Sequence, residues 1–240
     1  MIRLVAMMLM VIPVTIWGAS RIAWAFLTKA SDSACVCEDV QRRWSLALLK
    51  TAGVRVELEN DGVIDHEAPQ IVVANHVSWF DVLALAAFVP GRYAFVAKKE
   101  IGRVPLFGPS VRACGHIFID RHDRVQAVES LDSAKKRLEE ALPTVIMFPE
   151  GTRSETGDLQ PFKKGAFVLA IQTGADVVPT ALFGSREIMR KGSMLIRPGV
   201  IRVRFGDPIA VSEYDMEQRQ PLVDRAWQAL SDLQSRYKNA

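Results

Sequence analysis

A histidine and an aspartate lie five positions apart, directly after an apolar run of the chain. His76 and Asp81 follow residues 71–74, a run that is typical of a buried strand. Histidine is the side chain that most readily exchanges a proton near neutral pH, and a neighbouring carboxylate can fix its tautomer and stabilise its charged form. The pair therefore indicates general acid–base chemistry.

The spacing of this pair requires the chain to turn between its two members. In an unbroken α-helix, positions five apart point about 140° away from each other. Ser78 is a good helix N-cap, and residues 79–89 are apolar enough for a short buried helix. We expect His76 on the loop and Asp81 in the first helical turn, where the helix dipole favours a carboxylate. The competing interpretation is that His76 and Asp81 stand at this spacing by chance, and other features of the chain are needed to choose between the two.

The chain after residue 50 alternates short apolar runs with helical patterns. This is typical of an α/β fold in which helices flank a mostly parallel central sheet. We expect strands at residues 54–58, 71–74, 93–97, 117–119, 144–148, 177–183 and 201–205. We expect helices at residues 79–89, about 124–142 and 165–173, the last closed by Gly174, and a C-terminal helix that packs into the core through Val223, Trp227, Leu230 and Leu233.

Basic and acidic side chains follow four of these expected strands. His76, Lys98 and Arg121 come at or after the ends of three strands, and Glu150 and Arg153 follow a fourth. Ligands of open α/β sheets bind beyond the carboxyl ends of the strands, so we expect these residues to meet in one crevice. The planar fork of arginine and the point charge of lysine would suit a phosphate there.

The N-terminal region has the composition of a membrane segment. Residues 4–20 carry no charge, and the apolar pattern continues past Arg21 to residue 27. A helix of about 20 residues spans the hydrocarbon core of a bilayer. We expect residues 1–52 to be a membrane-anchoring helical segment that precedes an α/β domain at residues 53–240. A cleaved signal peptide and a buried core helix are the alternatives.

A second part of this region mixes arginines with large apolar residues. Arg42 and Arg43 stand next to Trp44 and several leucines within residues 40–49. This composition predicts an interfacial helix whose arginines extend their charged ends toward the lipid headgroups.

Composition restricts the function classes further. The chain has 240 residues, of which 49% are hydrophobic, and a net charge of +3. This small excess gives no argument for nucleic acid but suits an anionic substrate or a lipid surface. The three cysteines, Cys35, Cys37 and Cys114, are too few and odd in number for a disulfide framework, and they lack zinc spacing, so we expect no metal site.

Four segments, in this order, resemble the motif blocks of the glycerolipid acyltransferase family. Residues 75–81 resemble its His-x4-Asp block, residues 98–121 its second block, residues 148–154 its third and residues 178–180 its fourth. Within these blocks, Ile101, Leu106 and Thr180 depart from the usual residues without removing a chemical group. The likeness is greatest to the bacterial 1-acyl-sn-glycerol-3-phosphate acyltransferases.

This resemblance implies a role for each matching residue. His76 would be the general base and Asp81 its partner. Other residues would bind the acceptor, namely Lys98, Arg121 and Arg153 at its phosphate and Glu150, Gly151 and Thr152 around its glycerol portion. The resemblance implies no metal and no cofactor besides acyl-CoA or acyl-carrier protein as co-substrate. It places the protein at the inner (cytoplasmic) membrane, with its site on the cytoplasmic side and membrane lipid as a partner.

The expected reaction transfers a fatty acyl group to the free sn-2 hydroxyl of 1-acyl-glycerol-3-phosphate and makes phosphatidic acid. The alternatives are acylation of another lysolipid such as lyso-ornithine lipid, hydrolysis of the thioester by water, and lipid binding without catalysis. A nucleophilic Cys114 beside His116 is disfavoured, because both residues would lie near the start of a strand, away from the crevice. Acyl-chain length, the choice of thioester donor and the oligomeric state are not readable from the sequence.

Overall fold

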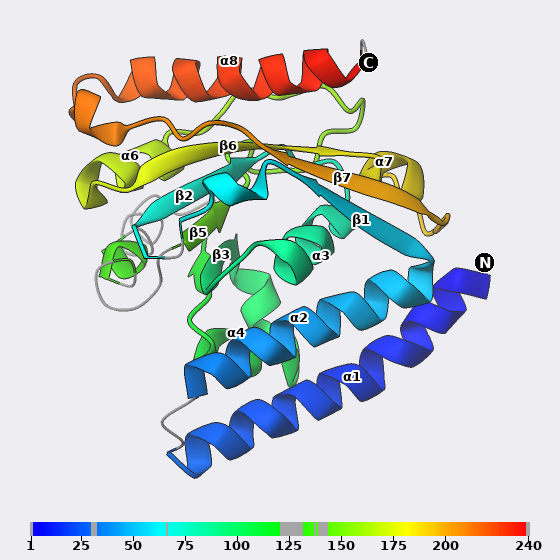
Figure 1. Cartoon of the computed structure of the whole chain (residues 1–240). Helices are drawn as coiled ribbons and strands as arrows, with labels where there is room; N and C mark the ends of the chain where they lie inside the picture. The colour runs from blue at the N-terminus through cyan, green and yellow to red at the C-terminus, as the bar shows by residue number, and fades with distance from the viewer. Residues whose placement is uncertain are drawn as a thin grey trace.

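The computed structural model describes residues 2–29, 33–65, 67–120, 132–136, 138 and 144–238. These residues fold into layers, with a central sheet between helices (Figure 1). In chain order, with η for a 3-10 helix, the elements are α1 (Ile2–Leu27), α2 (Ser33–Ala52), β1 (Val54–Glu59), η1 (Asp61–Val63), β2 (Gln70–Ala74), α3 (Trp79–Phe88), β3 (Tyr93–Lys98), η2 (Lys99–Arg103), α4 (Phe107–Ala113), β4 (Ile117–Ile119), β5 (Thr144–Met147), α6 (Gly165–Thr173), β6 (Asp176–Phe183), α7 (Ser185–Ile188), β7 (Gly199–Phe205), η3 (Val211–Glu213) and α8 (Arg219–Lys238).

The described strands form a seven-stranded sheet in the order β1-β7-β6-β2-β5-β3-β4. β6, β2, β5, β3 and β4 run parallel to one another, whereas β7 is antiparallel to β6 and parallel to β1. This confirms the expected mostly parallel sheet. Because β2, β5, β3 and β4 are neighbours and run parallel, the residues that follow them lie at the same end of the sheet, where the carboxyl ends of these strands meet.

Helices cover both faces of the sheet because the central strand is apolar on both sides. β2 is buried along its whole length. Ile71 and Val73 pack in the core that α6 and α8 cover, and Val72 and Ala74 pack in the core that α3 covers. Figure 1 shows α6 and α8 on one side of the sheet and α3 on the other, with α2 and then α1 beyond α3.

Helices α1 and α2 form a hairpin that extends these layers on the α3 side. Gly18 allows the close approach, because a Cβ at this position would lie 2.8 Å from Val40 Cγ1. Trp44 Nε1 also donates a hydrogen bond to Thr15 Oγ1 at 3.0 Å. α1 is long and apolar enough to cross a membrane, by length and composition. It exposes large apolar side chains along its length, including those of Ile2, Val5, Leu9, Ile12, Ile16, Trp24 and Leu27.

The position of Arg42 corrects the expectation of an interfacial helix with two arginines at the lipid headgroups. The Arg42 guanidinium donates hydrogen bonds to the carbonyl oxygens of Ala87, Val89 and Gly91, at 3.1, 2.7 and 3.0 Å. The last carbonyls of a helix have no partner within it, so this cation satisfies the end of α3. Only Arg43 remains exposed as expected.

A disulfide bond between Cys37 and Cys114 contradicts the expectation drawn from the cysteine count. It joins α2 to the residue after α4, across a sequence separation of 77, and leaves Cys35 exposed and free. The count was misleading because the bond depends on the packing of two helices that are far apart in the chain. The bond also removes Cys114 as a nucleophile.

The remaining elements agree with their expected positions to within about two residues, a normal uncertainty for element ends. Two expectations, Arg121 and most of the helix at residues 124–142, lie outside the described residues. α2 ends at Ala52, and β1 begins at Val54 after Gly53, which has a positive φ of 71°. The division into an anchoring segment and an α/β domain near residue 52 stays a prediction.

Candidate active site

The N-terminus of α3 is built as the sequence predicts. Ser78 is the N-cap residue, and its side chain accepts a hydrogen bond from the backbone N–H of Phe80. Asp81 occupies the third helical position and accepts from the backbone N–H of Ser78, which completes a capping box. This reciprocal capping turns the chain sharply between residues 76 and 81.

The turn brings the two predicted catalytic side chains together. His76 Nδ1 lies 2.9 Å from Asp81 Oδ2, which also accepts hydrogen bonds from the backbone N–H groups of Val77 and Ser78, both at 2.7 Å. The Asp81 side chain is fully buried, while that of His76 is 14% exposed. Since the ionised Oδ2 is only an acceptor, the ring proton belongs on Nδ1, and Nε2 is left as the basic atom. This arrangement can remove a proton from a substrate hydroxyl.

Stacked rings hold the flat side of the His76 imidazole. Its centroid lies 4.1 Å from that of Phe148, with an angle of 21° between the planes. Phe148 stacks on Phe95, which stacks in turn on His116. His116 is held by a hydrogen bond from the backbone N–H of Phe95 to Nδ1 and by contact of Nε2 with Gln41 Oε1, both at 2.9 Å. His116 thus supports the rings behind His76.

Glu150 connects the two loops that form the site. Its carboxylate accepts a hydrogen bond from the His76 backbone N–H at 2.6 Å and another from the Gln160 backbone N–H at 3.0 Å. The residue is only 4% exposed. These contacts hold the backbone of His76. Contact between Glu150 and a glycerol group, which the family resemblance implies, stays a prediction.

The pKa of the Glu150 carboxyl is raised from 4.5 to about 7. Burial is the main cause, because it penalises the charged form. The hydrogen bonds from His76 and Gln160 oppose this shift, and the nearby charge of Asp81 adds to it. The group that holds the histidine backbone therefore titrates near neutral pH.

Two further contacts extend the sheet beyond its strand ends. The Asn75 side chain donates to the carbonyl oxygen of Leu182 at 3.1 Å and accepts from its N–H at 2.7 Å. The Ser154 N–H donates to the carbonyl oxygen of His76 at 2.7 Å. Sequence reasoning gave Asn75 and Ser154 no role, although buried polar residues beside a reactive histidine are a usable signal.

The structure places two of the predicted cations at the carboxyl ends of the parallel strands. Arg153 lies 4.9 Å above the ring of Trp79, the first residue of α3. Lys98 is exposed at the end of β3. Neither forms an ion pair with a described residue, whereas Lys99 pairs with Asp120. Among the described residues, Lys98 and Arg153 are thus the predicted cations that no carboxylate pairs with.

A third cation, Lys163, lies over Gly151. The φ of Gly151 is +73°, and a Cβ there would lie 2.9 Å from Lys163 Nζ. The Lys163 backbone is fixed by a hydrogen bond from its N–H to the carbonyl oxygen of Pro149 at 2.8 Å. Thr152, the remaining predicted binding residue, is exposed on the same loop. Sequence reasoning missed Lys163 because it follows no strand.

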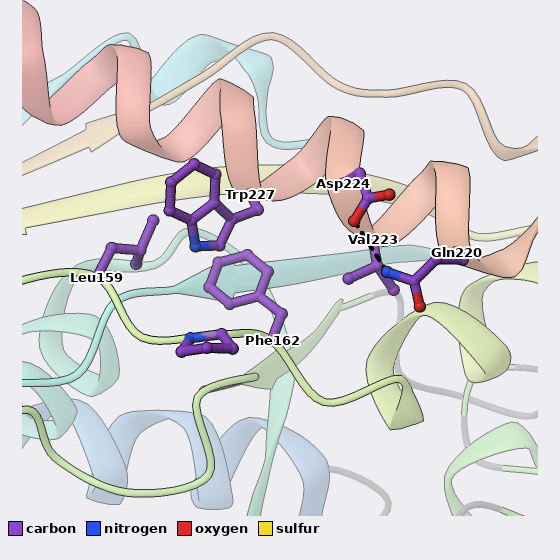
Figure 2. A pocket seen from close by; sticks show the side chains of 7 residues that line it. Leu159, Phe162, Gln220, Val223, Asp224 and Trp227 are labelled. Carbon is purple, nitrogen blue, oxygen red and sulfur yellow. Dashed lines mark hydrogen bonds between the residues drawn. The ribbon is translucent and has the colours of Figure 1, made fainter.

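A cleft of about 290 Å³ lies between α8 and the loop that leads into α6. Figure 2 shows Phe162 and Trp227 turned toward each other there, with Gln220 hydrogen-bonded to Asp224 along α8. None of the predicted site residues lines this cleft. Val223 packs in the core as expected and also forms part of the cleft wall. Trp227, which was expected in the core, is only partly buried and lines the cleft.

The part of the chain that the structure describes has an α/β fold. At the carboxyl ends of its parallel strands lie a histidine, a buried carboxylate and exposed or partly exposed cations. The family model described as "Acyltransferase" matches residues 55–182. The chain belongs to the acyltransferase family.

The chain is similar to named relatives in several organisms. A 1-acyl-sn-glycerol-3-phosphate acyltransferase of Cocos nucifera is 37% identical over 148 residues, which are 62% of this chain and 48% of that protein. One of Helicobacter pylori is 38% identical over 134 residues, which are 55% of this chain and 56% of that protein. A human protein, 1-acyl-sn-glycerol-3-phosphate acyltransferase alpha, is 31% identical over 72% of this chain and 61% of its own length. The chain spans about half the length of the curated relatives it matches.

A solved structure shares the fold. The crystal structure of the 1-acyl-sn-glycerophosphate acyltransferase PlsC from Thermotoga maritima matches with a TM-score of 0.81 and 23% identity. The match covers 97% of this chain and 95% of that chain. It therefore includes the N-terminal helices as well as the α/β domain.

Proposed function

We propose that the chain transfers a fatty acyl group from acyl-CoA or acyl-carrier protein to the free sn-2 hydroxyl of 1-acyl-glycerol-3-phosphate, forming phosphatidic acid. The observation that carries the proposal is the contact of His76 Nδ1 with the buried Asp81, at the N-terminus of a helix whose first residue also stacks with Arg153. The names of the relatives support the choice of acceptor.

The mechanism follows from the tautomer of His76. Nε2 removes the proton of the acceptor hydroxyl as the hydroxyl oxygen attacks the thioester carbonyl carbon. Asp81 stabilises the imidazolium that results. The tetrahedral intermediate then collapses, the carbon–sulfur bond breaks, and the imidazolium returns its proton to the departing thiolate. His76 thus ends the cycle in its starting form.

The cations support a phosphate on the acceptor. Lys98, Arg153 and Lys163 bring three positive charges to the loops that follow β3 and β5. A lyso-ornithine lipid lacks a phosphate and offers a single carboxylate beside its own ammonium group, so it would neutralise these charges less completely. Arg121, which lies outside the described residues, is proposed to bind the same phosphate.

The proposed location is the cytoplasmic face of the inner membrane, with membrane lipid as a partner. The exposed apolar surface of α1 supports membrane association. Both proposed donors are cytoplasmic thioesters, which supports a site on that side. The reaction as written uses the acyl thioester as co-substrate and calls for no metal.

The experiment that tests the proposal is acyl transfer by the purified full chain from labelled acyl-CoA to a panel of lysolipids. We expect label in phosphatidic acid when 1-acyl-glycerol-3-phosphate is the acceptor, and little label in products of lyso-ornithine lipid. Release of labelled fatty acid at the same rate with and without an acceptor would overturn the proposal in favour of a thioester hydrolase.

A further inference from the structure

The loop between α7 and β7, residues 189–198, presents two large apolar side chains to the outside. Met194 is 60% exposed and Leu195 is 48% exposed. The next residue, Ile196, is only 6% exposed, and the Arg197 N–H donates to the carbonyl oxygen of Ile188 at 3.0 Å. The base of the loop is therefore anchored, and its apolar tip is held outward.

Basic residues flank this tip in the sequence. Residues 186–197 contain four basic residues and one acidic residue, Glu187. Lys191 is paired with Glu155 at 3.0 Å. Arg190 and Arg197 are exposed and form no ion pair with a described residue. Apolar residues flanked by cations match the chemistry of an anionic lipid surface, where each arginine contributes about 1 kcal/mol of binding.

The loop adjoins the first turn of α1. A Cβ on Gly53 would lie 3.2 Å from Pro198 Cβ and 3.5 Å from Arg3 Nε, so Gly53 touches both the end of the loop and the start of the helix. Figure 1 shows the N-terminus of α1 and the turn between α7 and β7 at the same end of the molecule. The end of the loop therefore lies beside the start of α1, whose exposed apolar side chains begin with Ile2 and Val5.

The other end of the loop is hydrogen-bonded to residues 76–81, the turn that carries His76 and Asp81 and is called the catalytic turn below. Ser78 Oγ, the N-cap of α3, donates a hydrogen bond to the carbonyl oxygen of Met189 at 2.8 Å. One short loop thus runs from the helix that carries Asp81 to the start of the apolar helix α1.

We propose that residues 189–198 form a second lipid contact, which binds the surface of an anionic bilayer. Met194 and Leu195 enter the headgroup region, while Arg190 and Arg197 bind lipid phosphates beside Arg3. This contact holds the catalytic turn at the lipid surface. The proposal rests on membrane association through α1 and is independent of the reaction proposed above.

A fluorescence experiment tests this contact directly in the full chain. A Cys35→Ser background removes the free cysteine, and a fluorophore is attached at Met194→Cys. The protein is then placed in lipid discs of phosphatidylcholine and phosphatidylglycerol that contain a nitroxide-labelled lipid. Met216→Cys is the matched control, because Met216 is 40% exposed near the start of α8, on the other side of the sheet from α1. Thermal melting shows which labelled variants are folded.

We expect the nitroxide lipid to quench the fluorophore at position 194 several-fold more strongly than the one at position 216. Equal quenching at the two positions would overturn the proposal. Because the readout does not involve acyl transfer, the result is independent of whether the proposed function holds.

The charge component has its own measurement. We expect Arg190→Gln with Arg197→Gln, or high salt, to reduce quenching at position 194 in phosphatidylglycerol discs to the level in discs of phosphatidylcholine alone, because salt screens exposed charges. Quenching that is indifferent to phosphatidylglycerol, salt and both arginines would contradict binding to an anionic surface.

Discussion

Asp81 serves the helix and the proposed chemistry with the same oxygen atom. Oδ2 accepts the N–H groups of Val77 and Ser78 as well as the His76 ring. The carboxylate proposed to stabilise the imidazolium is therefore also the group that holds the turn in place. Substituting Asp81 should therefore affect both stability and activity, whereas substituting His76 should affect mainly activity.

We predict that Asp81→Asn lowers both stability and activity, because a neutral amide cannot reproduce three bonds to an ionised oxygen. The loss of a buried charged acceptor should cost about 2 kcal/mol or more of unfolding free energy. His76→Ala is the matched comparison and should retain most of the stability. Urea unfolding of the three proteins measures this, and equal stability of Asp81→Asn and the parent would refute the double role.

Arg153 and Lys163 should control the binding of the acceptor. We predict that Arg153→Ala or Lys163→Ala raises the KM for the lysophospholipid by about tenfold, the effect of losing about 1.4 kcal/mol of binding, and leaves the thioester KM nearly unchanged. Lys164→Ala is the control, because Lys164 is next to Lys163 in the chain and its side chain is exposed at the start of α6. The same lysophospholipid KM in all three variants would contradict the proposal that Arg153 and Lys163 bind the acceptor phosphate.

Glu150 should make stability depend on pH. Its pKa of about 7 in the fold lies above its ordinary 4.5. The folded state therefore binds this proton more tightly, and the resulting stability is full below about pH 4.5 and is lost as pH rises to about 7. We predict that the parent loses unfolding free energy relative to Glu150→Gln over this range, by at most about 1.4 kcal/mol per pH unit. A difference that is constant with pH would exclude this coupling.

The pairing of His76 with Asp81 could be predicted because it is local, with a cap residue and a helix start between the two. The bond from Glu150 to the His76 backbone spans 74 positions and depends on β5 lying next to β2. Lys163 escaped prediction for a similar reason, since a turn after β5 folds it back over Gly151. The contacts that complete the site are thus consequences of strand order.

At the scale of elements, the end of α3 depends on a side chain from α2. The Arg42 guanidinium reaches three carbonyl oxygens at or just after the C-terminus of α3. It thereby docks the helical hairpin onto the helix that carries Asp81. The periodicity of α2 alone could not reveal this, because an arginine on an apolar helix also suits a lipid interface.

We predict that Arg42→Gln lowers the unfolding free energy by about 2 kcal/mol or more, since it leaves buried carbonyl groups without their charged donor. Arg43→Gln is the matched control. Arg43 is 65% exposed and pairs with Asp39 one helical turn away, an interaction worth about 0.3–0.5 kcal/mol. Thermal melting in detergent compares the two, and similar losses would show that the contact with α3 is not stabilising.

At the scale of the whole molecule, the sheet places the candidate site residues at the carboxyl ends of neighbouring parallel strands, and α1 presents an exposed apolar surface. Alternating apolar runs were sufficient to predict an α/β fold, and the rule for strand ends was sufficient to place the described candidate site residues at the same ends of parallel strands. Their meeting in one crevice stays a prediction. The order of the strands was not predictable, because it is decided by packing between distant segments. The disulfide and the loop at residues 189–198 depend on that packing in the same way.

The most direct test of the account is the rate of acyl transfer by His76→Ala, measured with labelled acyl-CoA and 1-acyl-glycerol-3-phosphate at saturating concentrations. General base catalysis contributes about 10²–10⁴-fold, so we predict a loss of at least about two orders of magnitude in a variant that melts like the parent. Turnover close to that of the parent by the folded variant would contradict the claim that this histidine takes the proton from the acceptor.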